Sequence, residues 1–184
     1  MKTALILIDI QNDYFPGGKM ELEGSLQASA QAKRLLLHFR ESQLPLVHIQ
    51  HVATKPTAKF FLPDTDGVKL HENVKPLESE TLFQKHYPNS FRDTPLLDYL
   101  KREQIEQVII AGMMTHMCVD ATTRAAFDFG FQCLVASDAC ATRALAYDGI
   151  TVPADHAHRA FLAALNGTYG KVLSTDEILK SLGK

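Results

Sequence analysis

Three residues with different reactive groups each lie at or just after an apolar run of the sequence. Asp9 and Lys85 each end such a run, and Cys118 follows another by a few residues. A thiol can attack a carbonyl carbon, a carboxylate can accept its proton and later return it, and an ammonium can stabilise both anions. Together these groups are sufficient for acyl transfer through a covalent intermediate, provided that the fold brings them together.

Cys118 lies where an apolar run gives way to a helical pattern of small residues. The first turn of a helix has unpaired N–H groups and the positive end of the helix dipole, which lower the pKa of a thiol from about 8.5. The sequence therefore predicts a reactive thiolate at Cys118. Taken singly, these residues have simpler interpretations: Cys118 as a small buried apolar residue, Asp9 as a turn residue or helix cap, and Lys85 as a surface lysine.

The elements expected around these residues alternate between short apolar runs, typical of buried strands, and amphipathic helical patterns. Strands are expected at Thr3–Asp9, Pro45–His51, Thr81–Lys85, Gln107–Met113, Gln132–Ala136 and Lys171–Leu173. Helices are expected at Ser25–Ser42, Thr94–Glu103, Val119–Phe129, Asp155–Leu165 and from about Thr175. This alternation predicts an α/β fold with a parallel sheet between helices, in one domain spanning residues 1–184. Because ligands of such sheets lie beyond the carboxyl ends of the strands, the three reactive residues are expected at one edge.

Two other features of the sequence are assigned structural or loop roles. Cys133 falls inside an expected strand and Cys140 in a turn-like stretch, SDACATR, so both cysteines are interpreted as structural. The stretch from Ala53 to Ser79 is rich in Lys, Pro, Asp and His and has no regular pattern. A long irregular segment of this kind is typical of a functional or mobile loop.

The composition excludes several classes of protein. The 184 residues carry a formal net charge of −2, and the charges are scattered, so no nucleic-acid or membrane partner is expected. No apolar run approaches the roughly 20 residues of a membrane span. The N-terminal apolar run contains Asp9 and lacks a small-residue cleavage site, so it is not expected to be a signal peptide. Three cysteines are too few for a disulfide framework, and a cytoplasmic protein is predicted.

Three segments of the chain resemble the isochorismatase-like cysteine hydrolase superfamily, which includes isochorismatases, nicotinamidases and N-carbamoylsarcosine amidases. They are ALILIDIQNDYF, KHYPNSFRDTPLLDYL and VIIAGMMTHMCVDATTRAAFDFGF, and they occur in the family's order. The resemblance runs from about Ala4 to Leu173. It implies a three-layer α/β/α fold with a six-stranded, mostly parallel sheet, and it implies a homodimer or higher homo-oligomer.

The resemblance also implies roles for individual residues. It implies a catalytic triad of Asp9, Lys85 and Cys118. It further implies a cis peptide bond between Met113 and Met114, which would aim the Met114 N–H, with that of Cys118, at the substrate oxygen. Candidates to line the substrate pocket are Gln11, Phe15, Phe60, Phe61, Tyr87 and His116, of which the aromatic ones could equally be core or interface residues. Because each triad side chain lies at a strand end, we expect its replacement to leave the fold intact.

No metal or other cofactor is expected. Nicotinamidases of the superfamily hold a metal through an Asp-x-His and a further His after the second strand. The stretch after PLVHIQH in this chain contains no Asp-x-His. His48 and His51, three residues apart on a strand, would point to opposite faces of the sheet, so they are not expected to share an ion.

The sequence therefore predicts a hydrolase that cleaves a small-molecule amide, ureide or lactam C–N bond through a covalent acyl-enzyme. Two alternatives stay open at this point. One is a vinyl-ether hydrolase of the isochorismatase type, and the other is a non-catalytic thiol redox module that uses Cys118.

Overall fold

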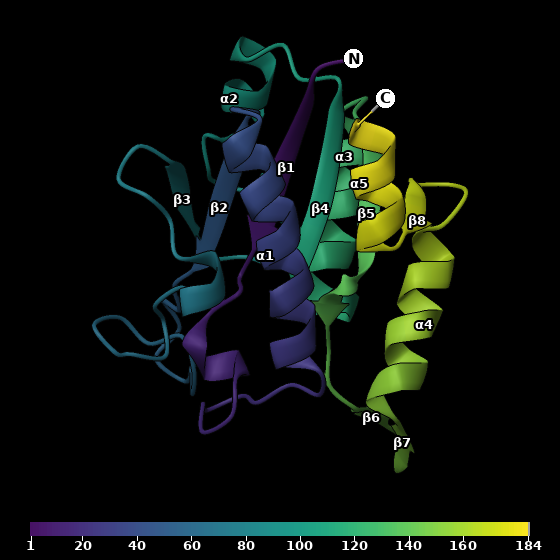
Figure 1. Ribbon diagram of the computed structural model, residues 1–184. Coiled ribbons are helices and arrows are strands. Elements are labelled where there is room, and N and C mark those ends of the chain that lie inside the picture. Colours follow the sequence, from purple (N-terminus) through teal and green to yellow (C-terminus); the bar gives the residue numbers. More distant parts are fainter. Residues whose placement is uncertain (184) are drawn as a thin grey trace.

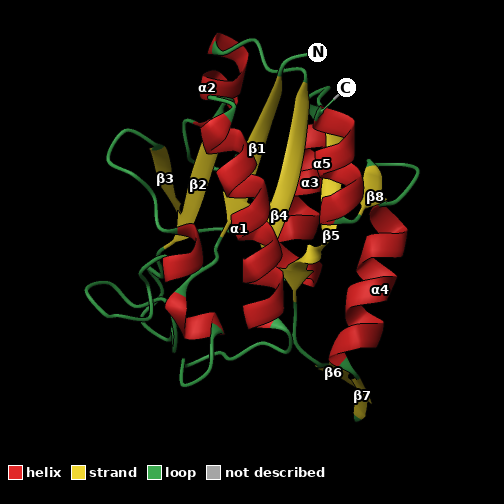
Figure 2. Cartoon of the chain, in the orientation of Figure 1, coloured by secondary structure: helices red, strands yellow, loops and turns green. Residues whose placement is uncertain are grey.

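The fold is built on one parallel sheet, and the computed structural model describes it over residues 1–183 (Figures 1 and 2). The sheet has six strands in the order β3-β2-β1-β4-β5-β8, and every neighbouring pair is parallel. The strands are β1 (Thr3–Ile8), β2 (Leu46–His51), β3 (Thr81–Lys85), β4 (Gln107–Met113), β5 (Gln132–Ala141) and β8 (Lys171–Leu173). The predicted six-stranded parallel sheet is confirmed.

Five α-helices cover the two faces of the sheet. They are α1 (Ser25–Glu41), α2 (Leu96–Arg102), α3 (Asp120–Asp128), α4 (Ala154–Leu165) and α5 (Thr175–Leu182). Figure 1 shows α1 and α5 in front of the sheet and α3 behind it. The buried side chains divide in the same way, because α1 and α5 pack in one apolar cluster and α2, α3 and α4 in the other. The predicted three-layer α/β/α architecture is therefore confirmed.

The central strand β1 is buried along its whole length, which explains its continuous apolar sequence TALILI. Leu5 and Leu7 face the cluster under α1, while Ile6 and Ile8 face the opposite cluster. Each such side chain contributes about 1.5–3 kcal/mol when it leaves water. Alternate residues of β1 thus pack against the helices on both faces of the sheet.

Gly112 permits β4 to approach β1 closely where the two strands end. It pairs with Ile8, and a Cβ at this position would collide with the Ile8 carbonyl oxygen. Its φ of 141° is also rare for residues with a side chain. Gly112 is therefore required where β1 and β4 end, just before the segments that carry the candidate functional residues.

Two parts of the structure differ from the sequence prediction. Strand β5 continues to Ala141, so Cys140 lies in a strand and not in a turn. A two-stranded antiparallel hairpin, β6 (Leu145–Tyr147) and β7 (Ile150–Val152), was not predicted. Its turn is Asp148–Gly149, with positive φ at both residues, which is the combination that a tight hairpin turn favours.

The long irregular segment after β2 contains a short 3-10 helix, η2 (Glu72–Val74), and another, η1 (Asn12–Tyr14), follows β1. Within residues 1–183, no helix combines the length and apolar character needed to cross a membrane.

Candidate active site

The three predicted catalytic residues meet beyond the carboxyl ends of β1, β3 and β4. The Lys85 Nζ lies 2.7 Å from Asp9 Oδ2 and 3.3 Å from Cys118 Sγ. Asp9 and Lys85 are fully buried, and Cys118 is 4% exposed. A carboxylate, an ammonium and a thiol therefore share one site that bulk water hardly reaches.

Asp9 is held in an uncommon backbone conformation directly after β1. Its φ is 51°, in the left-handed region, where aspartate is tolerated better than most residues. Its N–H donates to the Ile49 carbonyl at 3.0 Å, and its carbonyl accepts from the Gln11 N–H at 3.0 Å. Apart from the contact with Lys85, its carboxylate has no hydrogen-bond partner in the described part of the chain. One buried carboxylate oxygen is thus left for another proton donor.

Lys85 ends β3, and its ammonium reaches Asp9 although β2 lies between β3 and β1 in the sheet. Its ammonium also donates to the Tyr87 carbonyl at 3.0 Å and lies 3.2 Å from His51 Nδ1. Burial disfavours the charge, but the Asp9 carboxylate and Cys118 outweigh burial and raise the pKa of Lys85. Lys85 is therefore a buried, charged group, not a surface lysine.

Cys118 lies in a single wide helical turn, η3 (Thr115–Val119), that continues into α3. Burial first and Asp9 second raise the pKa of its thiol well above the ordinary value, although Lys85 opposes them. The predicted lowering of this pKa is wrong. Sequence reasoning counted the helix dipole, but desolvation and the Asp9 charge are larger effects. The thiol keeps its proton at rest, beside a carboxylate that can accept it.

The expectation that triad replacements leave the fold intact stays a prediction, but the reason for it is wrong, because these side chains lie in the interior. Asp9 and Lys85 form an ion pair with side chains 0% exposed. Removing one partner of such a pair leaves an uncompensated charge in the interior, at a cost of about 3–5 kcal/mol.

Two histidines fix the turn that carries Cys118. The Thr115 hydroxyl is hydrogen-bonded to His158 Nδ1 of α4 at 2.9 Å, and His116 Nδ1 is hydrogen-bonded to the Thr142 hydroxyl. The peptide bond between Met113 and Met114, where β4 leads into this turn, is cis. His116 is half-buried at the edge of the site, and burial lowers the pKa of its imidazole.

Gln11 holds the backbone at the site through its side-chain amide. Its Nε2 donates to the carbonyls of His51 and Val68 at 2.9 and 2.7 Å. Its Oε1 accepts from the His51 N–H at 2.8 Å. Both amide N–H groups are therefore used to join β2 to the following loop, and the oxygen keeps one free lone pair.

The next two residues of the DIQND segment pin the loop after β2. Asn12 Nδ2 donates to the Asp66 carbonyl at 3.1 Å. Asp13 is buried and accepts from the Phe61 N–H at 2.6 Å and the Lys19 N–H at 3.1 Å. In this segment Asp9 faces the reactive groups, and the other polar side chains fasten a loop more than 45 residues away in sequence. Hydrogen bonds therefore hold the irregular stretch from Ala53 to Ser79 at several points, and we call this stretch the pinned loop.

The aromatic candidates lie at different places. Phe61 is buried against Tyr14, with ring centroids 4.6 Å apart, and 5.9 Å from the His51 ring. Tyr87 contacts Lys85 through its carbonyl, and its ring stacks under the Arg92 guanidinium at 3.5 Å. Phe15 stacks on His71 at 3.7 Å, in a cavity that does not include the triad.

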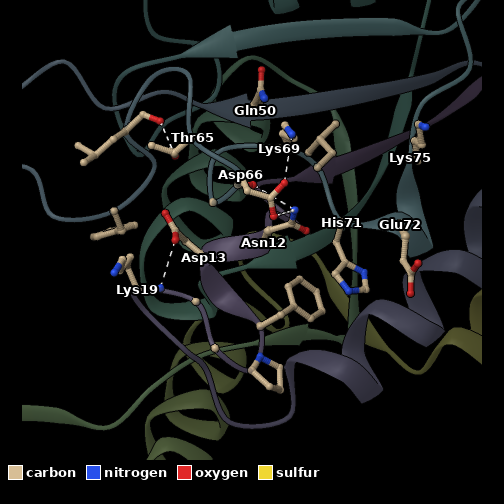
Figure 3. Close-up of a pocket in the computed structure, with 18 of the residues that line it drawn as sticks. Asn12, Asp13, Lys19, Gln50, Thr65, Asp66, Lys69, His71, Glu72 and Lys75 are labelled. Atoms are coloured by element: carbon tan, nitrogen blue, oxygen red, sulfur yellow. Dashed lines mark hydrogen bonds and ion pairs between the residues drawn. The ribbon is translucent and has the colours of Figure 1, made fainter.

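That cavity has a volume of about 990 Å³ and lies beside the pinned loop (Figure 3). Its walls carry Asn12, Asp66, Lys69 and His71, and none of the triad residues lines it. It contains no thiol and no ion pair comparable to Asp9–Lys85. Chemistry, not volume, therefore identifies the triad as the candidate active site.

Sequence reasoning missed two residues near the triad, Tyr14 and Arg143. Burial first, and then the proximity of Cys118 and Asp9, raise the pKa of Tyr14 well above its ordinary value, so its hydroxyl stays a proton donor. Arg143 is exposed, lowers the pKa of His116, and forms no ion pair with any residue from 1 to 183. Nothing in the local sequence indicated either residue, because both reach the site through loop packing.

The site also contains a cluster that has metal-ligand chemistry. Donor atoms of Asp9, His51 and Cys118 all lie within 4.8 Å of one another. However, the Lys85 ammonium already lies within 3.3 Å of a donor atom of each. A metal ion would have to displace this fully buried cation, so the residues do not fit a metal while Lys85 keeps its position.

Comparison with known proteins places the chain among hydrolases. The sequence profile of the isochorismatase domain matches residues 3–177. An uncharacterised isochorismatase family protein of Bacillus subtilis, YddQ, is 50% identical over 98% of this chain and 100% of its own length. A solved structure of an isochorismatase hydrolase from Oleispira antarctica is 49% identical, with a TM-score of 0.93 over 97% of this chain and 96% of that one. A maleamate amidohydrolase of Pseudomonas putida is 25% identical over 98% of this chain and 87% of its own.

Proposed function

Because this chain belongs to the isochorismatase family and is a hydrolase of that family, we propose that it cleaves a small-molecule C–N bond through Cys118, Asp9 and Lys85. The single observation that supports this most strongly is the buried contact of all three groups, with Lys85 Nζ at 2.7 Å from the carboxylate and 3.3 Å from the sulfur.

In the first step of the proposed mechanism, Asp9 accepts the thiol proton as Cys118 Sγ attacks the substrate carbonyl carbon. Negative charge moves from the carboxylate to the sulfur and, as the C–S bond forms, to the carbonyl oxygen of the substrate. The Lys85 ammonium contacts both the carboxylate and the sulfur, and the net charge of the site does not change. The backbone N–H groups of Met114 and Cys118 are the proposed donors to the oxyanion. Such donors contribute about 3–4 kcal/mol each to transition-state stabilisation.

In the second step, the C–N bond breaks and Asp9 returns its proton to the leaving nitrogen, which leaves a thioester on Cys118. Water then attacks the thioester carbonyl, and Asp9 accepts a proton from that water. The thiolate leaves and recovers the proton, so that the resting enzyme is regenerated. The Asp9 carboxylate oxygen that does not contact Lys85 supports this proton transfer, because it has no hydrogen-bond partner among residues 1–183.

The surroundings of the triad support a small substrate that carries an anionic group near the scissile amide. Tyr14 and His116 are neutral, and Asp9 and Lys85 compensate each other. Arg143 is the charge at this edge that lacks an ionic partner in the described chain. The maleamate amidohydrolase relative acts, by its name, on an amide. We therefore rank carboxylate-bearing amides first, followed by ureides and lactams.

Several further expectations belong to this proposal. Hydrolysis needs no metal or cofactor, and residues 1–184 act as one domain. The enzyme forms a homodimer or a higher homo-oligomer, and it works in the cytoplasm without a nucleic-acid or membrane partner. His116, Tyr87, Phe60 and Phe61 are the proposed lining of the substrate pocket, while Phe15 contributes from its outer side.

The experiment is a turnover screen of the full chain over amides, ureides, lactams and isochorismate, before and after exhaustive chelation. We expect ammonia or amine release from at least one amide or ureide, unchanged by chelation and abolished by Cys118→Ala. Turnover of isochorismate alone, retained by Cys118→Ala, would assign vinyl-ether hydrolysis instead. Loss of amide turnover on chelation, restored by zinc, iron or manganese, would overturn the metal-free mechanism. Reversible oxidation of Cys118 by peroxide without any hydrolysis would support the alternative that the protein is a non-catalytic thiol redox module.

A further inference from the structure

The Lys85 ammonium has more hydrogen-bond acceptors around it than it has protons. The acceptors are Asp9 Oδ2 at 2.7 Å, the Tyr87 carbonyl at 3.0 Å, His51 Nδ1 at 3.2 Å and Cys118 Sγ at 3.3 Å. A lysine ammonium donates three hydrogen bonds, and a protonated thiol is the weakest of these acceptors. At rest, therefore, the three N–H groups go to Asp9, Tyr87 and His51, while the sulfur stays within reach.

His51 occupies its place because its backbone is fixed from both sides. It ends β2, in register with Lys85 at the end of β3. The Gln11 side chain binds both its N–H and its carbonyl, and the Phe61 ring lies 5.9 Å from the imidazole. The ring is thus held against Lys85 by residues that take no part in the chemistry.

The neighbouring groups fix the protonation state of this ring. An ammonium has no lone pair, so Nδ1 is the acceptor and the ring proton lies on Nε2. Burial lowers the pKa of His51 to about 4, with Lys85 and His86 acting in the same direction and Asp9 in the opposite one. The ring is neutral above that pH, and its Nδ1 lone pair faces the Lys85 ammonium at 3.2 Å.

We infer that His51 is a positioning residue of this site: its neutral imidazole holds one N–H of the Lys85 ammonium and thereby keeps that cation between Asp9 and Cys118. Without this acceptor, three acceptors remain for the three N–H groups, but no neutral side chain opposes the pull of the carboxylate, so we expect the ammonium to lie nearer Asp9 and farther from the sulfur. When Cys118 loses its proton, the thiolate becomes a strong acceptor, and His51 is the neutral partner that can release its N–H to it. The inference builds on the proposed function, but its test needs no substrate.

The test compares the rate at which iodoacetamide alkylates Cys118, measured by peptide mass mapping over a range of pH, in three variants of the full chain. His51→Leu removes the acceptor. His51→Asn keeps it, because the Asn side-chain oxygen can occupy the place of Nδ1. His48→Asn is the matched control on the same strand, since His48 binds Glu80 on the other face.

We expect the alkylation curve of His51→Leu to move to higher pH by about one unit, which is a roughly tenfold slower reaction at a given pH. His51→Asn should restore most of the rate, and His48→Asn should match the unmodified enzyme. An unshifted curve for His51→Leu would overturn the inference. So would an Asn variant as slow as the Leu variant, or an equal shift from His48→Asn, which would point to general damage to β2.

A second measurement covers the case in which His51→Leu does not fold. In the unmodified protein, nitrogen NMR of the histidine rings should show His51 with Nδ1 unprotonated and Nε2 protonated at every pH from about 5 to 8. The resonances are assigned by their loss in His51→Asn. A protonated Nδ1 would contradict the inference. If alkylation and NMR agree with it while no C–N bond is hydrolysed, the proposed function fails and the role of His51 stands.

Discussion

The two ends of strand β3 carry two clusters with the same kinds of groups: a carboxylate, a cation and a histidine of β2. At its start, Glu80 binds Arg40 Nε and Nη2 at 2.6 and 2.8 Å and His48 Nε2 at 2.9 Å. At its other end, Asp9 pairs with Lys85, which also lies against His51. One cluster joins α1 to the sheet, and the other contains the reactive thiol.

The difference between these clusters lies in how completely the carboxylate is satisfied. Glu80 accepts from Arg40, His48 and the Leu77 N–H, and these bonds lower its pKa to about 2 against the cost of burial. Asp9 has one cationic partner and no other donor in the described residues. A carboxylate whose oxygens all accept hydrogen bonds stabilises the fold. A carboxylate with a free oxygen beside a thiol can still accept a proton.

The largest expected contrast is in turnover. Cys118→Ala, Asp9→Asn and Lys85→Ala should each reduce turnover of a confirmed substrate by at least about 10²-fold, because residues that act as one unit fail together. Glu80→Gln should keep turnover within about threefold, since Glu80 touches no reacting group. Steady-state kinetics on folded variants measures this. Near-normal turnover in Lys85→Ala would remove Lys85 from the mechanism.

The next contrast is in stability. Lys85→Met should lower the free energy of unfolding by about 3–5 kcal/mol, because it leaves the Asp9 carboxylate buried without a cation. The double variant Asp9→Asn/Lys85→Met should recover much of the loss. Glu80→Gln should cost less, about 1–3 kcal/mol, since Arg40 is 24% exposed and can be hydrated. Urea unfolding of all three distinguishes these cases, and equal losses at both clusters would contradict the account.

The decrease in the free energy of unfolding at acidic pH should depend on the cluster around Glu80. The folded pKa of Glu80 is about 2, below its ordinary 4.5. Its contribution is therefore fully present above about pH 4.5 and is lost as the pH falls toward 2. Burial lowers the pKa of His48, so its contribution is likewise lost as the pH falls below about 6.5. Unfolding free energies measured down to about pH 3 should fall less steeply in Glu80→Gln, and an unchanged slope would assign the acid sensitivity elsewhere.

The smallest expected contrast concerns the three thiols, each of which is at most 5% exposed. Burial raises the pKa of Cys133 and of Cys140 to about 12, and Cys133 contacts only backbone carbonyls. Cys118 alone has a base and an ammonium beside it. The pKa of Cys118 is raised as well, so burial favours none of the three thiols. Because Asp9 can accept the Cys118 proton as the sulfur reacts, we expect limiting iodoacetamide near neutral pH to label Cys118 about tenfold faster than the others. Equal labelling would show that Asp9 and Lys85 do not assist the thiol.

Sequence reasoning succeeded where a local pattern decides the structure. The bounds of β3, β4 and β8 agree with the prediction. The polar residues His86 and Ser174 directly follow β3 and β8, whereas β4 is followed by Met114. Sequence reasoning also brought Asp9, Lys85 and Cys118 to one edge, since parallel strands share their carboxyl ends. The hairpin after β5 was missed although Asp148–Gly149 carries its signal.

The failures concern properties that depend on distant partners. The pKa of Cys118 is set by burial and by Asp9, which lies 109 residues earlier in the sequence. The assignment of Gln11 to the pocket stays a prediction, but its hydrogen bonds to His51 and Val68 were not foreseen, because those partners come from other segments. The roles of His51, Tyr14 and Arg143 likewise depend on packing that no local spacing encodes.

Rapid-quench mass spectrometry with a confirmed amide substrate is the decisive experiment for a covalent acyl intermediate on Cys118. We expect a transient mass increase equal to the acyl fragment, localised to the peptide that contains Cys118. Cys118→Ala should show neither the adduct nor turnover. Turnover of the amide by Cys118→Ala, without any adduct, would contradict the account.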